Sequence, residues 1–331
     1  MRDSRKSFLK MPSSQRDQAF QPEAGAVPFP GYRLERLRGR GGFATVWEAI
    51  DPNGERLALK FMSSQNSSST ARELRSIQAI HKLSHPRLLR TRQVWSLPGQ
   101  IVIGMDLADA SLFDLFMLYA EEFNTLIDTE KICLYLYQAA EALDFLNARR
   151  HLFDGGLIAF QHGDIKPNNI LLVGDQAKLA DYGLSTPMIG PSTPCARQGT
   201  LEYAAPEIFA GTLAETSDQF SLAVTYYLLR TGSFPFPAPP AVIPRTYVRA
   251  VPDLSLLERE ERNILNRALS PVPQDRFPGC VELMTQLMKV KQLEVVRDPE
   301  RGMSVRATPD SVTRSKLMRA VMEAKLAAVR V

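Results

Sequence analysis

The stretch HGDIKPNNILL, residues 162–172, decides how this sequence is interpreted. It places Asp164, Lys166, Asn168 and Asn169 within six positions, directly before a run of three apolar residues that is typical of a strand. Polar side chains gathered this densely beside a strand are typical of a functional site. Gly163 directly precedes Asp164 and brings no charge to the cluster. The questions are therefore what the cluster binds and whether it works without a cation at residue 163.

A second aspartate, Asp181 in LADYG, follows the cluster after two short apolar runs, ILL at 170–172 and KLAD at 178–181. The turn-like VGDQ between these runs predicts a hairpin, whose two ends lie close together. The hairpin can therefore bring Asp164, Asn169 and Asp181 to one point. Such hard oxygen ligands suit Mg²⁺, which also bridges substrate phosphates. A single aspartate would more often cap a turn, but the joint pattern favours a magnesium site.

GRGGFATV, residues 39–46, lies between two strand-like runs and is rich in glycine. Glycines let a backbone approach phosphate closely and offer it N–H groups, although Gly-rich turns without a ligand are also common. The stretch follows G-x-G-x-x-G-x-V except that Ala44 stands at the third glycine. No helix-forming sequence follows it, which disfavours a dinucleotide fold, and it lacks the G-K-[ST] ending of a P-loop.

Lys60 stands among apolar residues in the strand-like LALKF. A buried ammonium group needs a partner, so two interpretations are open. Either Lys60 lies on the solvent face of its strand, or it binds phosphates and is held by a carboxylate. Glu73, on a helix predicted at 70–83, is the nearest suitable acid downstream.

Hydrophobic periodicity divides the chain into a β-rich part and a helical part. Alternating runs predict strands over 31–61, with an Asn53-Gly54 hairpin turn, and further strands near 88–95 and 100–106. Helical spacing predicts helices at 111–122, 128–149, 215–231, 256–269 and 278–292. The fold class is therefore α+β, with a small antiparallel β-rich lobe followed by a larger α-helical lobe. Ligands commonly bind in clefts between such lobes.

The composition is typical of a soluble globular protein: of 331 residues, 44% are hydrophobic and 23% are charged. No apolar run is long enough to span a bilayer, and the N-terminus carries no secretory signal. The three cysteines are far apart and odd in number, so we expect free thiols in a reducing, cytoplasmic compartment. The net charge of +4 lies in the two tails, which argues against a nucleic-acid-binding main domain.

The two ends of the chain differ from the middle. Residues 1–31 are polar and broken by prolines, and we expect a flexible leader there. Residues 293–331 form a basic tail, in which 311–331 could be a helix with basic side chains on one side. That helix could pack on its own lobe, or it could contact a partner or an anionic membrane. The chain could also be part of a longer protein.

Over about residues 32–292, the order of these motifs resembles that of a eukaryotic-type (Hanks-type) serine/threonine protein kinase. The motif sequences are similar to those of bacterial members of the family. The resemblance implies the bilobal kinase fold, with an N-lobe at about 32–108 and a C-lobe at about 109–292. It also identifies AAPE, residues 204–207, as the end of the activation segment. Glu207 would pair with Arg276, and Asp218 would brace the catalytic loop.

The resemblance implies roles for the polar residues singled out above. Asp164 would be the catalytic base and Lys166 would neutralise the γ-phosphoryl group, while Asn169 and Asp181 would hold Mg²⁺. Lys60, paired with Glu73, would contact the α- and β-phosphates of ATP. The residues around the nucleotide would be Gly39, Gly41, Ala44, Val46, Ala58, Lys60, Met105, Leu107 and Leu171. Residues 105–107 would form the hinge that bonds the edge of the adenine.

Four departures from the kinase pattern remove no charge that the chemistry needs. Arg38 replaces an apolar residue over the nucleotide, so its stem would cover the base. Ala44 stiffens the glycine loop, and Tyr182 replaces Phe in the DYG triplet. Gly163 replaces the Arg that in many relatives pairs with a phosphate on the activation loop. We therefore expect an enzyme that does not depend on activation-loop phosphorylation, although the loop contains Ser185, Thr186, Ser192 and Thr193.

The expected partners are ATP and proteins with Ser or Thr acceptors, and no nucleic acid. Lys166 and Thr200 in GTLEY resemble the pattern of Ser/Thr rather than tyrosine kinases. Two alternatives remain: a pseudokinase-like scaffold, and a small-molecule kinase of the same fold. The complete set of charged motif residues disfavours the first, and the APE segment with its brace disfavours the second.

Overall fold

A computed structural model describes residues 20–41, 44–63, 83–153, 155–182, 185–188, 190–195, 199–244, 246–298 and 302–308. Internal contacts divide the chain into two compact units. The N-terminal unit comprises Met1–Asp109 with Tyr182–Leu184, and the C-terminal unit comprises Ala110–Asp181 with Ser185–Val331. The helix predicted at 70–83 lies almost wholly outside the described residues.

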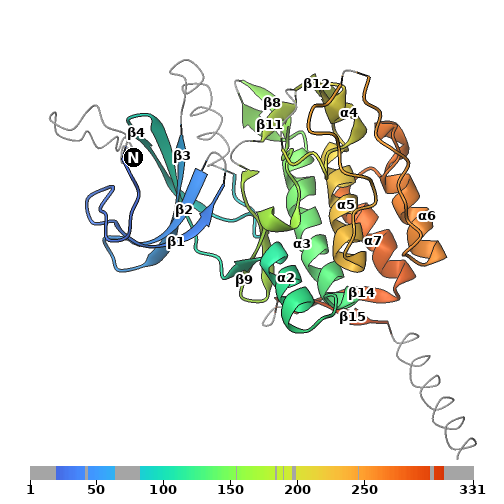
Figure 1. The fold of residues 1–331 in the computed structure, drawn as a ribbon, viewed down its shortest axis with the longest axis horizontal. Helices are drawn as coiled ribbons and strands as arrows, with labels where there is room; N and C mark the ends of the chain where they lie inside the picture. Colours follow the sequence, from blue (N-terminus) through green and yellow to red (C-terminus); the bar gives the residue numbers. More distant parts are fainter. Residues whose placement is uncertain are drawn as a thin grey trace, which may run out of the picture. The chain divides into compact units, whose positions relative to one another are not determined.

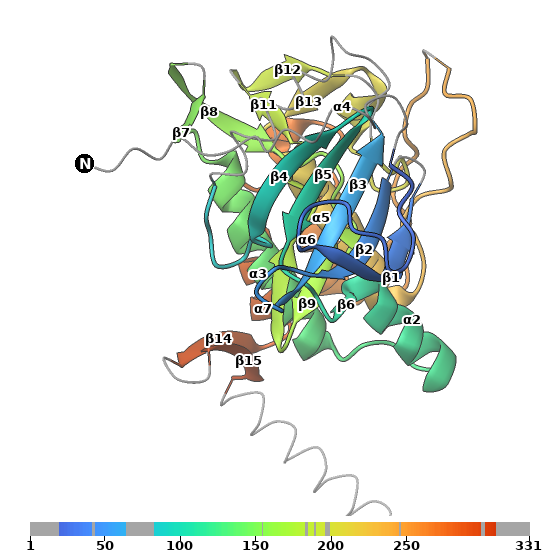
Figure 2. The same cartoon turned by 90° about the vertical axis from the view of Figure 1, so that its left-hand side faces the viewer.

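The N-terminal unit contains a five-stranded antiparallel sheet in the order β1-β2-β3-β5-β4 (Figure 2). Its strands are β1 (Arg33–Arg40), β2 (Ala44–Ile50), β3 (Arg56–Ser63), β4 (Thr91–Leu97) and β5 (Gln100–Met105). The predicted Asn53-Gly54 turn is confirmed: Gly54 has φ +82°, and Asp51 Oδ1 accepts hydrogen bonds from the N–H groups of Asn53 and Glu55 at 2.8 and 2.9 Å. Leu34, which is fully buried, belongs to the core beneath the sheet.

Residues 20–31 pack against this sheet, so the expectation of a flexible leader is wrong for them. The ring of Phe29 stacks on Trp95 with centroids 4.5 Å apart, and that of Phe20 stacks on Phe61 at 5.7 Å. The backbone joins as well, because Leu34 N–H donates to the carbonyl of Ala26 at 2.9 Å. The aromatic side chains between the prolines bury apolar surface, and this outweighs the polar composition of the segment.

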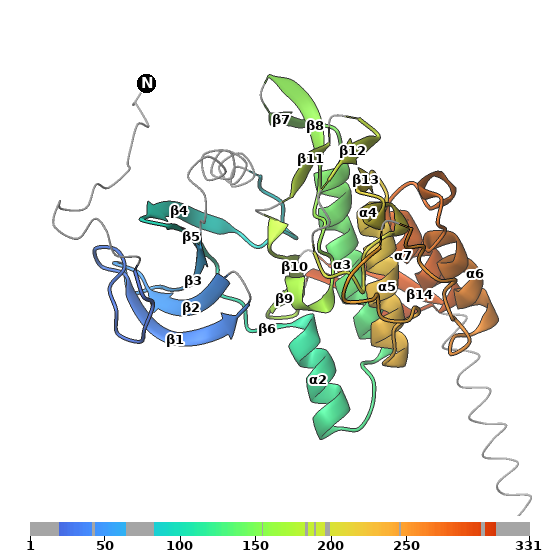
Figure 3. The same ribbon diagram turned by 45° about the horizontal axis from the view of Figure 1, so that its top comes forward.

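The C-terminal unit is mainly helical (Figures 1 and 3). Its helices are α2 (Leu112–Glu122), α3 (Thr129–Asn147), α4 (Pro206–Phe209), α5 (Ser217–Thr231), α6 (Arg259–Ala268) and α7 (Cys280–Val290). Two small sheets carry the segments of the site: β6 (Ala110–Ser111), β9 (Ile170–Val173) and β10 (Gln176–Leu179), and β7 (His151–Phe153), β8 (Gly156–Gln161) and β11 (Thr186–Met188). Two further ladders are β12 (Ser192–Pro194) with β13 (Thr212–Ala214), and β14 (Leu293–Asp298) with β15 (Gly302–Ala307).

Helix α5 is the centre of the C-terminal unit, with α3 and α7 packed beside it (Figures 1 and 3). Every residue from Ser217 to Leu229 is buried. Gly232 ends the helix with φ +74°, a left-handed conformation that glycine adopts without strain. A helix buried on all sides is a rigid base, so the side chains it presents are held in place.

The first part of the expected basic tail is a β-hairpin. Strands β14 and β15 pair from Leu293 with Ala307 to Asp298 with Gly302, and Leu293 and Met303 are buried. Arg297 joins the hairpin to α3 through an ion pair with Glu141 at 2.5 Å. The helix predicted at 311–331 lies outside the described residues. Among the helices of the described residues, none combines the length and the apolarity that crossing a membrane requires.

Phe29→Ala should destabilise the N-terminal unit by about 3 kcal/mol, because a buried aromatic ring is removed from a stacked cluster. Urea unfolding followed by tryptophan fluorescence measures this directly, since the chain has 2 tryptophans, Trp47 and Trp95, and both lie in the sheet. Val27→Ala is the matched control, because Val27 is 56% exposed and should change the free energy of unfolding by less than about 0.5 kcal/mol. If Phe29→Ala also changed the free energy of unfolding by less than about 0.5 kcal/mol, packing of Phe29 would not stabilise the sheet.

Candidate active site

Residues 162–169 form a loop between strands β8 and β9 of the C-terminal unit. Pro167 begins a short 3₁₀ turn that ends at Asn169, where the N–H of Asn169 donates to the carbonyl of Lys166 at 3.0 Å. The run ILL then enters β9, which pairs with β10 through the predicted hairpin. The strand and the turn therefore fix both ends of the polar cluster.

The carboxylate of Asp164 lies at the centre of this loop. Its Oδ1 accepts a hydrogen bond from the N–H of Thr200 at 2.9 Å. Its Oδ2 contacts Lys166 Nζ at 2.8 Å and accepts from Asn169 Nδ2 at 3.0 Å. Burial alone would raise the pKa of Asp164, but the bonds and charge of Lys166 and the bonds from Thr200 outweigh it and lower the pKa. Asp164 is therefore ionised at neutral pH and can accept a proton.

Lys166 connects Asp164 to the segment after residue 198. Its ammonium group also donates to Thr200 Oγ1 at 2.5 Å. Lys166 and Thr200 border a pocket of about 490 Å³, whose other lining residues are Asn168, Asn169, Glu202, Tyr203 and Phe234. A cation beside an ionised carboxylate, at the edge of an open pocket, can position an anionic group next to a proton acceptor.

Backbone hydrogen bonds bring Asn169 close to the residue before Asp181. The N–H of Ala180 donates to the carbonyl of Asn169 at 2.9 Å, and His162 Nε2 bonds the carbonyl of Ala180 at 2.7 Å. Asn169 uses its amide N–H groups on the carbonyl and carboxylate of Asp164, which leaves its amide oxygen available for a ligand. An amide oxygen and a nearby carboxylate are a donor set that fits Mg²⁺.

Asp181 has an unusual backbone conformation. Its φ is +61°, in the left-handed region that residues other than glycine rarely occupy. Such a conformation costs about 1–3 kcal/mol and persists where the surrounding structure imposes it, often at functional sites. Asp181 is also an exposed residue.

Asp218, at the start of α5, holds the loop at residues 162–169 through hydrogen bonds to its backbone. The N–H groups of His162 and Gly163 donate to its two carboxylate oxygens at 2.7 and 2.9 Å. Asp218 is 1% exposed, and burial raises its pKa. Gly163 has φ +79°, a conformation that glycine reaches without strain.

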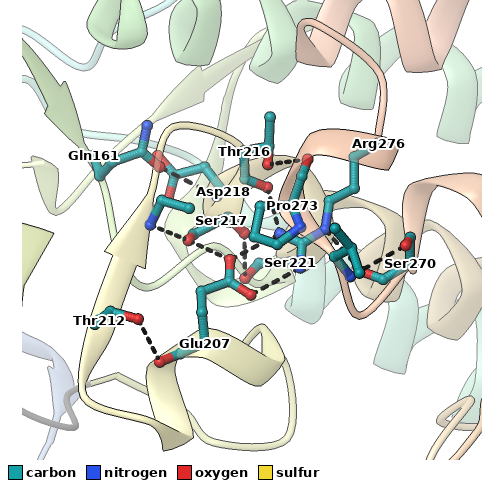
Figure 4. Close-up of polar contacts among 12 residues, drawn as sticks. Gln161, Glu207, Thr212, Thr216, Ser217, Asp218, Ser221, Ser270, Pro273 and Arg276 are labelled. Carbon is teal, nitrogen blue, oxygen red and sulfur yellow. Dashed lines mark hydrogen bonds and ion pairs between the residues drawn. The ribbon is translucent and has the colours of Figure 1, made fainter. Parts of the chain in front are cut away.

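The end of the activation segment is anchored by an ion pair between Glu207 and Arg276 (Figure 4). Both guanidinium nitrogens of the pair lie 2.8 Å from the carboxylate oxygens. The two side chains are 9% and 0% exposed, and Ser217 Oγ adds a hydrogen bond to Glu207 at 2.6 Å. Removing one partner of a buried ion pair typically lowers the free energy of unfolding by about 3–5 kcal/mol. The segment is therefore firmly attached to the helical core.

The N-terminal unit holds the other group of sequence-predicted site residues. Gly39 pairs with Val46 across β1 and β2, and the N–H of Gly41 donates to the carbonyl of Ala44 at 2.8 Å. Lys60 on β3 lies opposite Val46. Ala58 and Met105, on β3 and β5, lie opposite each other and are both buried, and Leu107 follows β5. Leu171 belongs instead to β9 of the C-terminal unit, and Glu73 lies outside the described residues.

Two residues of the N-terminal unit make hydrogen bonds that sequence reasoning missed. The guanidinium of Arg38 donates to the carbonyls of Ala108 and Asp109 at 3.1 and 2.9 Å. The hydroxyl of Tyr182 donates to the carbonyl of Leu89 at 2.5 Å. The partners lie far away in sequence, so no local pattern marks them. Arg38 and Tyr182 both depart from the kinase pattern, and the polar groups that they add therefore have hydrogen-bond partners.

The fold and the site define a protein kinase domain, and comparisons with known proteins agree. The profile of the protein kinase domain family matches residues 32–292. Serine/threonine-protein kinase PknF of Mycobacterium tuberculosis is 31% identical over 288 residues, covering 80% of this chain and 57% of that protein. Serine/threonine-protein kinase PknJ of the same organism is 32% identical over 232 residues, covering 66% of this chain and 37% of that protein.

Solved structures give the same result. The crystal structure of the Mycobacterium tuberculosis PknI kinase domain matches with a TM-score of 0.61 and 26% sequence identity, covering 81% of this chain and 99% of that chain. The chain belongs to the protein kinase domain family, among bacterial Hanks-type serine/threonine kinases, and the predicted kinase fold is confirmed. The chain spans 57% of the length of the PknF relatives, little more than half.

Gly199→Ala should reduce phosphoryl transfer from ATP to a test protein by at least about tenfold, because small displacements of catalytic groups are costly. A Cβ at Gly199 would lie 2.6 Å from the carbonyl oxygen of Gly163 and 3.2 Å from Asp164 Oδ1, and φ is +83°. Gly211→Ala is the matched control, since Gly211 has φ +81° but its Cβ would only reach the Cys195 carbonyl at 3.7 Å. If both variants lost phosphoryl transfer to the same extent, backbone strain and not the contact with the loop would explain the loss. If both kept the wild-type rate, the prediction would be wrong.

Proposed function

We propose that this protein is an ATP-dependent serine/threonine protein kinase that uses Asp164 as its catalytic base. The oxygen of a substrate hydroxyl attacks the γ-phosphorus, the bond to the β–γ bridging oxygen breaks, and ADP leaves. Asp164 orients the hydroxyl and takes its proton, and Lys166 stabilises the charge on the γ-phosphoryl group. The observation that supports this best is the carboxylate of Asp164 held between Lys166 and Thr200, which both line the pocket.

We propose that Asn169 and Asp181 hold Mg²⁺. The metal ion would neutralise the charge of the phosphates when ATP is bound. The amide oxygen of Asn169 and the carboxylate of Asp181 are suitable ligands by type, and the Ala180–Asn169 hydrogen bond at 2.9 Å keeps their backbones together.

The nucleotide-binding residues of the proposal follow from the family pattern. Lys60, paired with Glu73, contacts the α- and β-phosphates, and the glycine loop covers them. The residues assigned to the nucleotide are Gly39, Gly41, Ala44, Val46, Ala58, Met105, Leu107 and Leu171. The pairing of Val46 with Lys60 and of Ala58 with Met105 supports the assignment, because it groups these residues in neighbouring strands of one sheet.

We also propose that the active state does not require activation-loop phosphorylation. Gly163 offers no cation for a phosphate. The described parts of the segment are instead held by backbone pairing: β11 pairs with β8, and β12 pairs with β13. Ser185 is 3% exposed, so a kinase has poor access to its hydroxyl. These ladders supply the order that a phosphate supplies in many relatives.

The substrates we propose are proteins with Ser or Thr acceptors, in the cytoplasm. Cys133 and Cys280 are free and buried, which suits a reducing compartment. Burial raises the pKa of Cys133 to about 12, so its thiol stays protonated and unreactive.

Asp164→Asn should lower the rate of labelled phosphate transfer by at least about 100-fold, the lower range of general base catalysis. The assay follows transfer from γ-labelled ATP with Mg²⁺ to proteins of a cell lysate, with phosphosites mapped afterwards. Asp175→Asn is the matched control, because Asp175 is exposed in the β9–β10 turn. Equal incorporation by wild type and Asp164→Asn would favour a scaffold or a contaminating kinase. Transfer to small metabolites and not to proteins would favour a small-molecule kinase.

Combined alanine substitution of Ser185, Thr186, Ser192 and Thr193 should lower kcat/KM by less than tenfold, or about 1.4 kcal/mol. The physical reason is that backbone ladders, not a phosphate, order the segment. Steady-state kinetics on protein purified with and without phosphatase treatment measures the effect. A larger loss, or inactivation by phosphatase, contradicts the independence that we propose.

A further inference from the structure

Arg249 is a buried arginine outside the site described so far. It lies in the proline-rich segment between α5 and α6 and is 7% exposed. Its guanidinium carbon lies 4.1 Å from the ring centroid of Phe236, 5.5 Å from that of Phe209 and 5.8 Å from that of Phe220. Three aromatic rings therefore surround a cation in the interior.

The hydrogen bonds of Arg249 go to the backbone of the activation segment. Nη1 donates to the carbonyl of Leu201 at 3.0 Å, and Nη2 donates to the carbonyl of Glu202. Among the described residues, no carboxylate forms an ion pair with this guanidinium, and its Nε has no partner. Burial lowers the pKa of Arg249 to about 10, so the group is still charged at neutral pH.

Burying a charged side chain without a carboxylate partner costs free energy, because the charge loses its hydration. Apolar side chains of similar volume often stabilise such positions better, because they avoid the loss of hydration. Packing alone therefore does not explain an arginine here. What the guanidinium adds is directional: a planar fork of N–H groups fixed on two consecutive carbonyls.

The two carbonyls lie in a segment whose other residues line the pocket beside Lys166. Thr200, directly before them, donates its N–H to Asp164 at 2.9 Å and accepts from Lys166 at 2.5 Å. Glu202 and Tyr203 line the pocket itself. A shift of the backbone at residues 201–202 would thus move both the pocket wall and the partner of Asp164.

We propose that Arg249 is a positioning residue for the protein substrate, which holds the backbone of Leu201 and Glu202 so that the pocket wall stays fixed beside Asp164. The proposal rests on the kinase function proposed above. It assigns to the segment between α5 and α6 a role in substrate binding that is separate from ATP binding.

The test compares Arg249→Met and Arg249→Lys with wild type. Methionine keeps most of the apolar contact with the rings and loses the hydrogen bonds, whereas lysine keeps the charge but cannot span two carbonyls. The matched control is Arg267→Met, because Arg267 lies 4.2 Å from the ring centroid of Phe277 and donates to the carbonyls of Asp275 and Arg276 at 3.2 and 3.3 Å. Its ring contact and carbonyl bonds are of the same kind, although its side chain is exposed, and no hydrogen bond or ring contact joins it to residues 200–203.

Three quantities are measured: the KM and kcat for myelin basic protein, the KM for ATP, and hydrogen exchange of the amides of Tyr203 and Ala204. These amides donate to the carbonyls of Thr200 and Leu201 at 3.0 and 3.2 Å. Arg249→Met should raise the KM for the protein about tenfold, the effect of one charge-assisted hydrogen bond. It should also speed exchange of both amides, with the KM for ATP unchanged and the melting temperature not lowered. Arg249→Lys should lie between Arg249→Met and wild type.

Unchanged KM for the protein together with unchanged exchange would overturn the proposal. So would equal changes in Arg267→Met, or a lower melting temperature of both Arg249 variants without faster exchange in the folded state. If wild type transfers no phosphate at all, the proposed function fails, but the exchange measurement still decides whether Arg249 holds the segment. If Arg249→Met does not fold, Arg249→Lys and its exchange rates decide the question.

Discussion

The loop at residues 162–169 depends on one buried carboxylate, that of Asp218. It accepts the N–H groups of His162 and Gly163, and it is carried by a helix in which every residue from Ser217 to Leu229 is buried. Gln161 completes the arrangement, because its side-chain oxygen accepts the N–H of Asp218 at 3.3 Å while its amide group donates to Asn147 at 2.8 Å. Since a buried carboxylate without partners is strongly destabilising, the loop and the helix hold each other in a single geometry.

The position of Asp164 then follows from close packing around two glycines. Gly163 reaches φ +79° and Gly199 reaches φ +83°, and the space for a Cβ at Gly199 is taken by the carbonyl of Gly163. The segment that begins at Gly199 therefore lies directly on the loop at residues 162–169. With no side chain at residue 163, contact between the described parts of the two segments is made by backbone atoms and by Thr200, which bonds the carboxylate of Asp164 and the ammonium group of Lys166.

The sequence predicted the elements whose signals are local. The Asn53-Gly54 turn, the β9–β10 hairpin and the helix around Asp218 each have their own turn residues or apolar period. The leader and the tail were less predictable. Between the prolines of residues 20–31 no period is visible, and the rings of Phe20 and Phe29 find partners far away on the sheet. The β14–β15 hairpin was not predicted, because its strands are short, bury few side chains and therefore show no clear hydrophobic period within a basic tail.

The site was predictable to the same extent. Motif residues such as Asp164, Asn169 and Asp181 stand close together in the chain, so their chemistry is visible in one stretch. Arg249 and Arg38 carry no such mark. Arg249 bonds carbonyls 47 and 48 residues away, and Arg38 bonds carbonyls 70 and 71 residues away. Contacts of a side chain with a distant backbone leave no pattern in either segment, and only the folded chain reveals them.

The hydroxyl of Tyr182 has a consequence for pharmacology. In the kinase pattern this position is Phe, whose ring has no hydroxyl to form a polar contact. Here the ring is anchored by the hydrogen bond to the Leu89 carbonyl, and Tyr182 is 4% exposed. An inhibitor that must displace this ring would leave a buried carbonyl unsatisfied, at a cost of about 1–3 kcal/mol, or roughly 5- to 150-fold in affinity. Compounds that leave the ring in place avoid that penalty, so the tyrosine favours them over compounds that displace it.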